Sequence, residues 1–301
     1  MQSLKILIKR NIKLFFLDKG LFFTALITPV ILLVLYATFL SNIYEQSFLL
    51  SFPVGMEISD KIVHGFAGTQ LLSSLLAVSS VTVPFCANML MVSDKVSGAK
   101  RDFMITPISK NTLALSYYLA TLFVSLLICY FALVVCLVYI AFAGWFFSLI
   151  DVVMLIIDVS VLVFFGTALS SLINVFLTSQ GQISAVGSII SSVYGFISGA
   201  YMPIANFSEW LRKVVGFFPG TYGTAIIRTH AHKGVLEHVQ NEGIASAEVC
   251  KKIADSVDCS VFFFGKRVNT GVAYLIVLGA ILLFIGLFVL VHVKKSKKSN
   301  G

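Results

Sequence analysis

Charged side chains are scarce in this chain of 301 residues. Asp, Glu, Lys and Arg together make up 12% of it, against about 25% in soluble globular domains. Hydrophobic residues account for 58%, 27 of the residues are Phe, and the mean hydropathy is +0.95. So few charges could not cover so much apolar side chain in water. The shortage excludes an ordinary water-soluble protein, and the chain must use lipid as part of its solvent.

The chain also lacks the sequence patterns of common catalytic and cofactor sites. It has no G-x-x-x-x-G-K-[ST] phosphate-binding loop, no H-E-x-x-H, no dinucleotide-binding glycine pattern and no nucleophile elbow. Its five cysteines form no C-x-x-C pair. We therefore expect this chain to be no enzyme, with no catalytic residue, no metal and no cofactor of its own.

Apolar stretches long enough to cross a bilayer, about 20 residues each, recur six times. We predict spans at 21–44, 62–93, 113–141, 152–177, 182–203 and 268–293. The fold class predicted is an all-α integral membrane protein of six transmembrane helices, with Pro84 expected to kink the second. Residues 1–301 form one transmembrane domain. Its parts are an interface segment 1–20, spans one to five over 21–204, an extracellular loop 205–267, the sixth span and a basic tail 294–301.

The positions of the basic residues predict the orientation of the spans. Thirteen Lys and Arg precede span one, separate spans two and three, or follow span six. The short loops on the other side hold Lys61 as their single basic residue, beside Glu45, Glu57, Asp60 and Asp151. The positive-inside rule then puts both termini in the cytoplasm and the protein in the cytoplasmic membrane. The net charge of +8 thus belongs to the cytoplasmic face, and nucleic acid is not expected as a partner.

Residues 1–20 predict an amphipathic helix in the cytoplasmic interface. Lys5, Lys9 and Lys13 recur every four residues, with apolar side chains on the other faces. A basic flank that only sets the topology is the alternative. A secretory signal fits less well, because the following apolar stretch is too long and no small-residue cleavage site is evident.

The polar segment 205–267 offers two candidate sites. Cys250 and Cys259 lie in it, where oxidation could join them in a disulfide, and two free thiols are the alternative. His230, His232 and His238 could suggest a zinc site, but the favoured interpretation is a solvated polar loop with incidental histidines. Residues 205–218 have the pattern of an interfacial amphipathic helix.

Two of the predicted spans contain unusual residues. Asp158 is a carboxylate inside span four and a candidate for proton coupling, although its closeness to Asp151 could let it reach water. No basic residue of the spans is available to pair with it. In span five, small residues recur every four positions at Gly187, Ser191, Gly195 and Gly199. Such a stripe predicts a close helix contact, within one subunit or at a dimer axis.

Two segments of the sequence resemble the permeases of type-two ABC exporters. Asp94, Gly98 and the turn 106–109, which contains Pro107, have the spacing typical of the family's cytoplasmic loop between spans two and three. Arg101 departs from the pattern, because the family often has an acidic residue there. Residues 199–203, Trp210, Pro219 and Arg228 are similar to the family's re-entrant turn and outer helix after span five. With the six spans, the resemblance covers essentially the whole chain.

The resemblance implies a permease subunit of an ATP-driven exporter. Residues 99–106 would be the coupling helix that docks on a separate ATPase subunit, which binds ATP and Mg²⁺. A second permease copy or a paralogue would complete the pathway, with a cavity at the dimer interface lined mainly by spans two and five. The implied site residues are Asp94, Gly98, Lys100, Arg101, Phe103 and Pro107 for docking, Gly187, Ser191, Gly195 and Gly199 for helix packing or dimerisation, and Pro203, Trp210, Pro219 and Arg228 for the outer re-entrant region.

The residues by themselves are less specific than the resemblance. Gly98 and Pro107 bracket about two turns of helix with an apolar ridge, which without the resemblance would be a solvated basic loop. An apolar or amphiphilic substrate (drug, antibiotic, peptide or lipid) suits the poorly charged spans. The alternatives are a permease for polysaccharides or lipid-linked glycans, an ion-coupled secondary transporter that uses Asp158, and a membrane scaffold without transport.

Overall fold

A computed structural model describes residues 2–53 and 56–297, without the side chains of residues 37, 104 and 292–297. The chain is almost entirely helical. In order, the elements are α1 (Gln2–Leu17), α2 (Lys19–Leu35), the π-helical η1 (Tyr36–Leu40), α3 (Ser41–Leu49), α4 (Asp60–Val96), α5 (Ala99–Met104), α6 (Lys110–Ala143), α7 (Leu149–Asn174), α8 (Gln180–Ile197), the 3₁₀ turn η2 (Ile204–Asn206), α9 (Glu209–Val215), α10 (Pro219–Asn241), α11 (Ala247–Ser256), β1 (Phe262–Phe263), β2 (Lys266–Arg267) and α12 (Thr270–Lys297). The side chains of the predicted basic tail at 294–301 lie outside what the structure describes.

Within the described residues, five helices are long and apolar enough to cross a membrane. They are the continuous helix 19–49 formed by α2, η1 and α3, then α4, α6, α7 and the first 22 residues of α12. This confirms an all-α membrane protein. α4 continues through Pro84 without interruption.

Side-chain caps explain where several helices begin. Asp18 accepts a hydrogen bond from Leu21 N at the start of α2, and Ser109 accepts one from Thr112 N at the start of α6. At α7, Ser148 and Asp151 form a reciprocal capping box. Each cap satisfies an amide that the first turn of a helix would leave without a partner.

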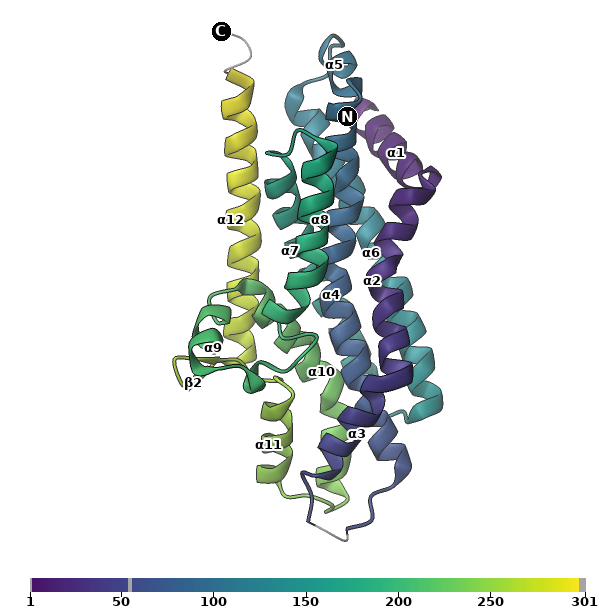
Figure 1. Ribbon diagram of the computed structural model, residues 1–301, viewed down its shortest axis with the longest axis vertical. Helices are drawn as coiled ribbons and strands as arrows, with labels where there is room; N and C mark the ends of the chain where they lie inside the picture. Colours follow the sequence, from purple (N-terminus) through teal and green to yellow (C-terminus); the bar gives the residue numbers. More distant parts are fainter. Residues whose placement is uncertain (1, 54–55, 298–301) are drawn as a thin grey trace.

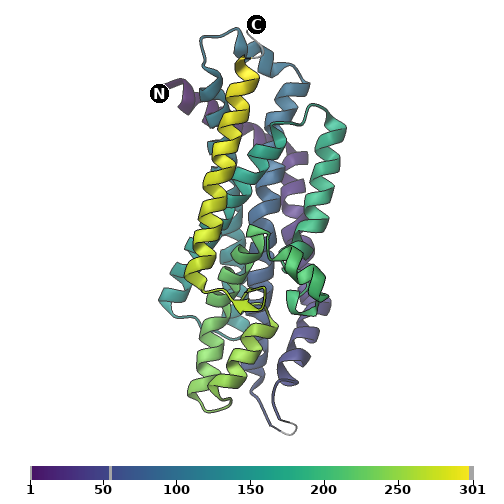
Figure 2. The same cartoon turned by 90° about the vertical axis from the view of Figure 1, so that its left-hand side faces the viewer.

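The long axis of the bundle has two distinct ends. Figure 1 places α5 at one end and α11 at the other, which we call the α5 end and the α11 end. The start of α1 and the last turns of α12 both lie towards the α5 end (Figures 1 and 2). Five crossings would leave the two ends of the chain on opposite sides. α8, 18 residues long, and then α10 run from the α5 end towards the α11 end.

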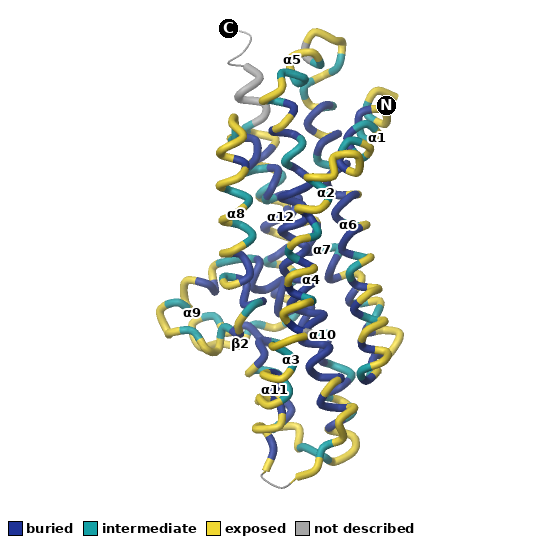
Figure 3. Tube along the Cα trace, turned by 45° about the vertical axis from the view of Figure 1, so that its right-hand side comes forward, coloured by how far each residue is buried: buried dark blue, intermediate teal, exposed yellow. Residues whose placement is uncertain are grey.

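α4 is the central helix of the bundle and is buried along most of its 37 residues (Figure 3). It packs against α2, α3, α6, α7, α8 and α10. Gly166 of α7 makes one of these contacts especially close, because a Cβ there would lie 2.3 Å from the carbonyl oxygen of Ser80. The outer faces of α2, α6 and α12 carry exposed Leu, Ile, Val and Phe side chains, as lipid-facing helices do.

The prediction of 205–267 as a solvated loop is wrong for its middle part. α10 packs into the bundle against α4, α7 and α12. It runs antiparallel to α7: Gly223 lies against Leu162, His230 bonds Asp158 and Lys233 pairs with Asp151. The sequence of α10 is polar because its side chains bond to other helices inside the protein.

Candidate functional site

Four helices meet around one arginine at the α5 end. Arg10 of α1 donates from Nη2 to Asp94 Oδ1 of α4 at 3.0 Å and from Nη1 to the other carboxylate oxygen. The Tyr117 hydroxyl of α6 donates to the same carboxylate. The Arg10 guanidinium also lies 4.9 Å from the ring centroid of Phe103 in α5, a cation–π contact. We call these four residues the Arg10 node.

The Arg10 node is partly shielded from water. The Asp94 side chain is 8% exposed and that of Arg10 28%, so their attraction is screened less than at an open surface. The hydrogen bond to Asp94 raises the pKa of Arg10, so the guanidinium stays charged. Leu7, Met91 and Leu113 pack beside the node. It therefore joins the start of α1 to the end of α4.

α5 is the short helix predicted at 99–106, although it ends at Met104. Gly98 precedes it with φ of +87°, a left-handed conformation that favours glycine, and its carbonyl accepts from Arg101 N at 2.7 Å. Phe103 lies on the side of α5 that faces Arg10. Arg101, Ile105 and Pro107 are exposed instead, and Ile105 is 87% exposed. One side of α5 is thus fixed to the bundle and the other is open.

A second contact fixes the end of α4 to the end of α7. Lys95 Nζ donates to the carbonyl oxygens of Asn174 at 2.9 Å, Val175 at 3.2 Å and Leu177 at 3.2 Å. A cation at this place satisfies carbonyls that the last helical turn leaves open and complements the helix dipole. The neighbours Asp94 and Lys95 therefore hold α4 to α1 on one side and to α7 on the other.

Arg228, predicted in the outer re-entrant region, organises the turn after α8. It is fully buried and donates to Gly199 O at 2.7 Å, to Ala200 O at 3.4 Å and to Ser74 Oγ of α4 at 3.4 Å. Its Nη1 lies 3.2 Å from Asp258 Oδ2. Asp258 in turn accepts from the amides of Ile204 and Ala205. The pair fixes both ends of the turn 199–205.

Burial and ion pairing oppose each other at Asp258. Burial raises the pKa of its carboxyl, while Arg228 and the two amides favour the charged form. The other predicted residues of this region lie apart from the pair. Pro203 precedes η2, Trp210 is exposed on α9, and Pro219 is the first residue of α10.

The histidines do not form a metal site. His232 is fully buried and bonds Gln70 Oε1 at 2.7 Å and Thr69 Oγ1 at 2.8 Å, and burial lowers its pKa to about 3. His238 lies against the Phe146 ring. No group of three or more His, Cys, Asp or Glu side chains suited to a metal occurs in residues 2–53 and 56–297. The interpretation of these histidines as incidental residues of a solvated loop is wrong.

Asp158 has partners that the sequence analysis did not anticipate. His230 Nδ1 lies 2.6 Å from its Oδ2, and the Tyr274 hydroxyl of α12 donates to its Oδ1. The expectation concerned basic residues of the predicted spans, and this histidine comes from α10, which lies in the segment predicted to be a loop. The carboxylate joins α7, α10 and α12.

The predicted disulfide is absent from the structure, where both cysteines of this region are free thiols. Cys250 Sγ lies 3.8 Å from Leu236 O, and Cys259 Sγ lies 3.6 Å from Arg228 O. Hydrophobic packing and the Arg228–Asp258 pair hold the segment instead.

A groove of about 900 Å³ lies between the helix 19–49 and α8, and we call it the main groove. Its wall is mostly apolar, with hydroxyls from Ser47, Ser51, Ser191 and Ser192. α4 contributes Phe66 alone to it. The cavity that the resemblance implies, at the interface of two permease copies and lined mainly by spans two and five, stays a prediction.

The small-residue stripe of α8 is used largely inside the subunit. A Cβ at Gly187 would lie 2.7 Å from Met89 Cε of α4, and one at Gly195 would meet the Tyr201 ring. Ser191 lines the main groove, and Gly199 has φ of +76° in the turn after α8. The stripe allows α4 and the turn to approach α8.

Sequence reasoning missed Arg10, Lys95 and Tyr117. A signal existed for Arg10, because it falls outside the four-residue spacing of Lys5, Lys9 and Lys13. It lies three residues after the buried Leu7 and beside the buried Asn11. No sequence pattern indicated the role of Tyr117, because that role depends on where α6 passes α4.

Comparison with known proteins shows a family. A family model described as ABC-2 family transporter protein matches residues 51–290, which include α4 to α11 and most of α12, whereas the helix 19–49 precedes the matched range. No curated protein matches the chain. The match includes α5, the turn after α8 and α10.

Proposed function

This chain belongs to the ABC-2 family of transporter proteins, and on that premise we propose that it is the permease subunit of an ATP-driven exporter. Separate ATPase subunits would bind ATP and Mg²⁺, and two permease copies, or one copy and a paralogue, would form the complex. The α5 end would face the cytoplasm and the α11 end the outside of the cell. α8 would be the fifth of six spans, followed by a re-entrant turn.

One observation carries the proposal: α5 is fixed on one side and open on the other. Phe103 attaches α5 to the other residues of the Arg10 node, and so to α1, α4 and α6. Arg101 and Ile105 are exposed. A surface of this kind can receive a push from a docked ATPase subunit and pass it to several helices. Closure of two ATPase subunits around ATP would favour one arrangement of the helices through its differential contacts.

The main groove supports an apolar or amphiphilic substrate. Its wall combines apolar side chains with a few hydroxyls, and its volume is at the upper end of the roughly 300–1,000 Å³ typical of small-molecule sites. We propose that such a compound enters the pathway along α2 and α8.

The aromatic side chains of the main groove bear on one alternative, a permease for lipid-linked glycans. Tyr36, Tyr44 and Tyr201 all line it, and sugars stack on such rings. Two of these rings already stack on each other, with centroids 5.6 Å apart and planes 2° apart. This pairing leaves less aromatic surface for sugars and favours the amphiphile.

The deciding experiment is co-purification of the chain with a co-expressed ATPase subunit. We expect the wild-type chain to retain the subunit and Ile105→Asp to lose it. The matched control is Leu50→Asp, because Leu50 is equally exposed, at 86%, but lies beyond α3 towards the α11 end. Retention that is unchanged by Ile105→Asp would overturn docking at α5, and a wild-type chain that binds no ATPase subunit would overturn the function.

A further inference from the structure

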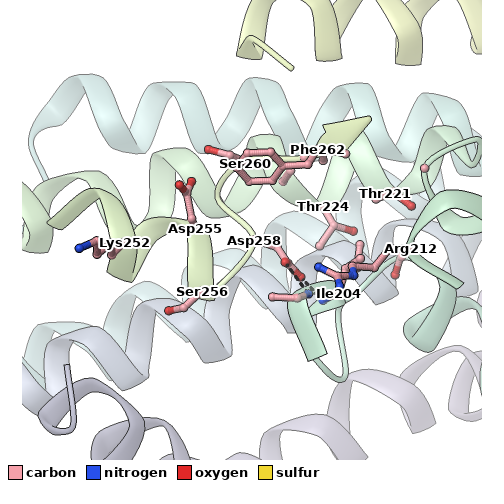
Figure 4. A pocket seen from close by; sticks show the side chains of 15 residues that line it. Ile204, Arg212, Thr221, Thr224, Lys252, Asp255, Ser256, Asp258, Ser260 and Phe262 are labelled. Carbon is pink, nitrogen blue, oxygen red and sulfur yellow. Dashed lines mark hydrogen bonds between the residues drawn. The ribbon is translucent and has the colours of Figure 1, made fainter. Parts of the chain in front are cut away.

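A second cavity, of about 380 Å³, lies towards the α11 end beside the main groove. We call it the α9 pocket. Its lining comes from the turn after α8, from α9, α10 and α11, and from residues 258–262 (Figure 4). The turn 202–206 lies between the two cavities, since Met202, Pro203 and Asn206 line the main groove, and Ser256 of α11 lines both. No residue of the Arg10 node takes part.

The charged side chains that line the α9 pocket, apart from Arg212, have ion-pair partners. Both of its carboxylates have arginine partners: Asp258 pairs with Arg228 at 3.2 Å and Asp255 with Arg267 at 3.4 Å. Lys252 pairs with Glu248 at 3.0 Å, and it points away from the pocket in Figure 4.

Arg212 is an exposed cation of the α9 pocket, and its charge also acts on Glu209, three residues earlier in α9. It extends from α9 towards the interior of the pocket in Figure 4. No ion pair to its guanidinium occurs within the part of the chain that the structure describes, residues 2–53 and 56–297. The guanidinium is therefore free to bind an anionic group.

The rest of the wall is suited to an apolar chain with one polar contact. Ile204, Ala225, Val261 and Phe262 provide apolar surface. Ser198 is 1% exposed, and its hydroxyl is buried without a hydrogen-bond partner. A buried hydroxyl in this state costs free energy that a bound acceptor would recover.

We propose that the α9 pocket binds a single-chain amphiphile with one anionic head group, which pairs with Arg212 while the chain lies along Phe262 and Ile204. The volume is near the lower end for small-molecule sites, which suits one chain and excludes a two-chain lipid. The head group can be a carboxylate or a phosphate, because a guanidinium binds both. The site does not depend on the proposed export function.

The test is photolabelling of the full chain in lipid nanodiscs with a diazirine-bearing dodecanoate, followed by mapping of the labelled peptides. We expect labels on α9, the start of α10 and residues 260–262. Dodecanoate and dodecyl phosphate should compete for the label, whereas dodecylamine and dodecanol should not. Stronger competition by one of the two anions identifies the head group that the site prefers.

Two matched pairs of variants locate the contacts. Arg212→Gln should weaken labelling about tenfold, as loss of a charge-assisted hydrogen bond does, while Lys213→Gln, a neighbour paired with Glu209, should not. Phe262→Ala should also weaken it, and Phe264→Ala, which is exposed outside the pocket, should not. Label confined to the lipid-facing helices, undiminished labelling of Arg212→Gln or equal competition by dodecylamine would each overturn the proposal.

Discussion

Arg10 and Asp94 are 84 residues apart in the sequence, yet the guanidinium of one donates to both carboxylate oxygens of the other. The pair joins α1 to α4, and Phe103 and Tyr117 bring α5 and α6 to the same point. Four side chains thus connect α5 to three further helices.

Arg10→Ala should weaken the coupling between the substrate and ATP hydrolysis. The variant leaves Asp94 with the Tyr117 hydroxyl and without its cation, which should lower the free energy of unfolding by about 2 kcal/mol. We expect substrate-stimulated ATPase activity of the reconstituted complex to fall at least severalfold. The control is Lys9→Ala, since Lys9 is exposed on the same helix. The double charge swap Arg10→Asp with Asp94→Arg should recover part of the coupling; equal activity of all four proteins would show that the Arg10 node has no role.

Gly98→Ala should destabilise the start of α5 through the backbone alone. No atom lies within 4 Å of a Cβ at this position, so the cost of about 1 kcal/mol comes from the φ of +87°. Gly279→Ala in α12 also adds a Cβ in open space, but in a helix, where alanine is preferred. Thermal unfolding in detergent should therefore shift down for the first variant and stay level or rise for the second. Equal shifts would contradict the left-handed conformation.

Arg228→Met should destabilise the protein strongly. It leaves the Asp258 carboxylate buried without a cation, a change that costs about 3–5 kcal/mol. Adding Asp258→Asn removes the lone charge and should recover a substantial part of the loss. Lys251→Met on the exposed face of α11 is the control. If the double variant unfolds no later than Arg228→Met, the ion pair is not what holds the turn 199–205.

All five thiols should be alkylated when the protein is denatured without reductant. A Cys250–Cys259 disulfide would leave three. In the folded protein, burial raises the pKa of Cys259 to about 12 and that of Cys250 above its usual range. Both stay protonated at pH 7.5, so native alkylation at these two positions should be slow compared with the denatured chain. Intact-mass spectrometry counts the adducts, and peptide mapping assigns them.

Asp158→Asn should affect stability more than energy coupling. The amide still accepts hydrogen bonds, so a modest loss of about 1 kcal/mol is expected at the junction of α7, α10 and α12. Transport by the variant should keep its dependence on ATP. Wild-type transport driven by a proton gradient without any ATPase subunit, and lost in Asp158→Asn, would instead support the ion-coupled alternative.

The sequence was sufficient for features that depend on local patterns. Long apolar runs predicted the five long helices, and Gly98 with Pro107 predicted the position of α5 to within two residues. Such features follow from helix length in lipid and from backbone preferences, which neighbouring residues determine.

The sequence was insufficient where a residue's role depends on distant partners. α10 has the composition of a solvated loop, and only its contacts with Ser74, Gln70 and Asp158 explain why its polar residues are buried. Periodicity cannot distinguish a polar helix in water from one whose polar groups bond to other helices. The same limit hid the partnership of Arg10 with Asp94.

The central position of α4 has a consequence for how the protein is made. Ribosomes complete residues 60–96 long before α10, so Gln70 meets His232 only after 162 further positions have been synthesised. Until then, the side-chain carbonyl of Gln70 lacks the partner that α10 supplies. Unsatisfied polar groups are costly in hydrocarbon. A chain truncated after α7 should therefore insert α4 poorly and be degraded, although all of α4 itself is present.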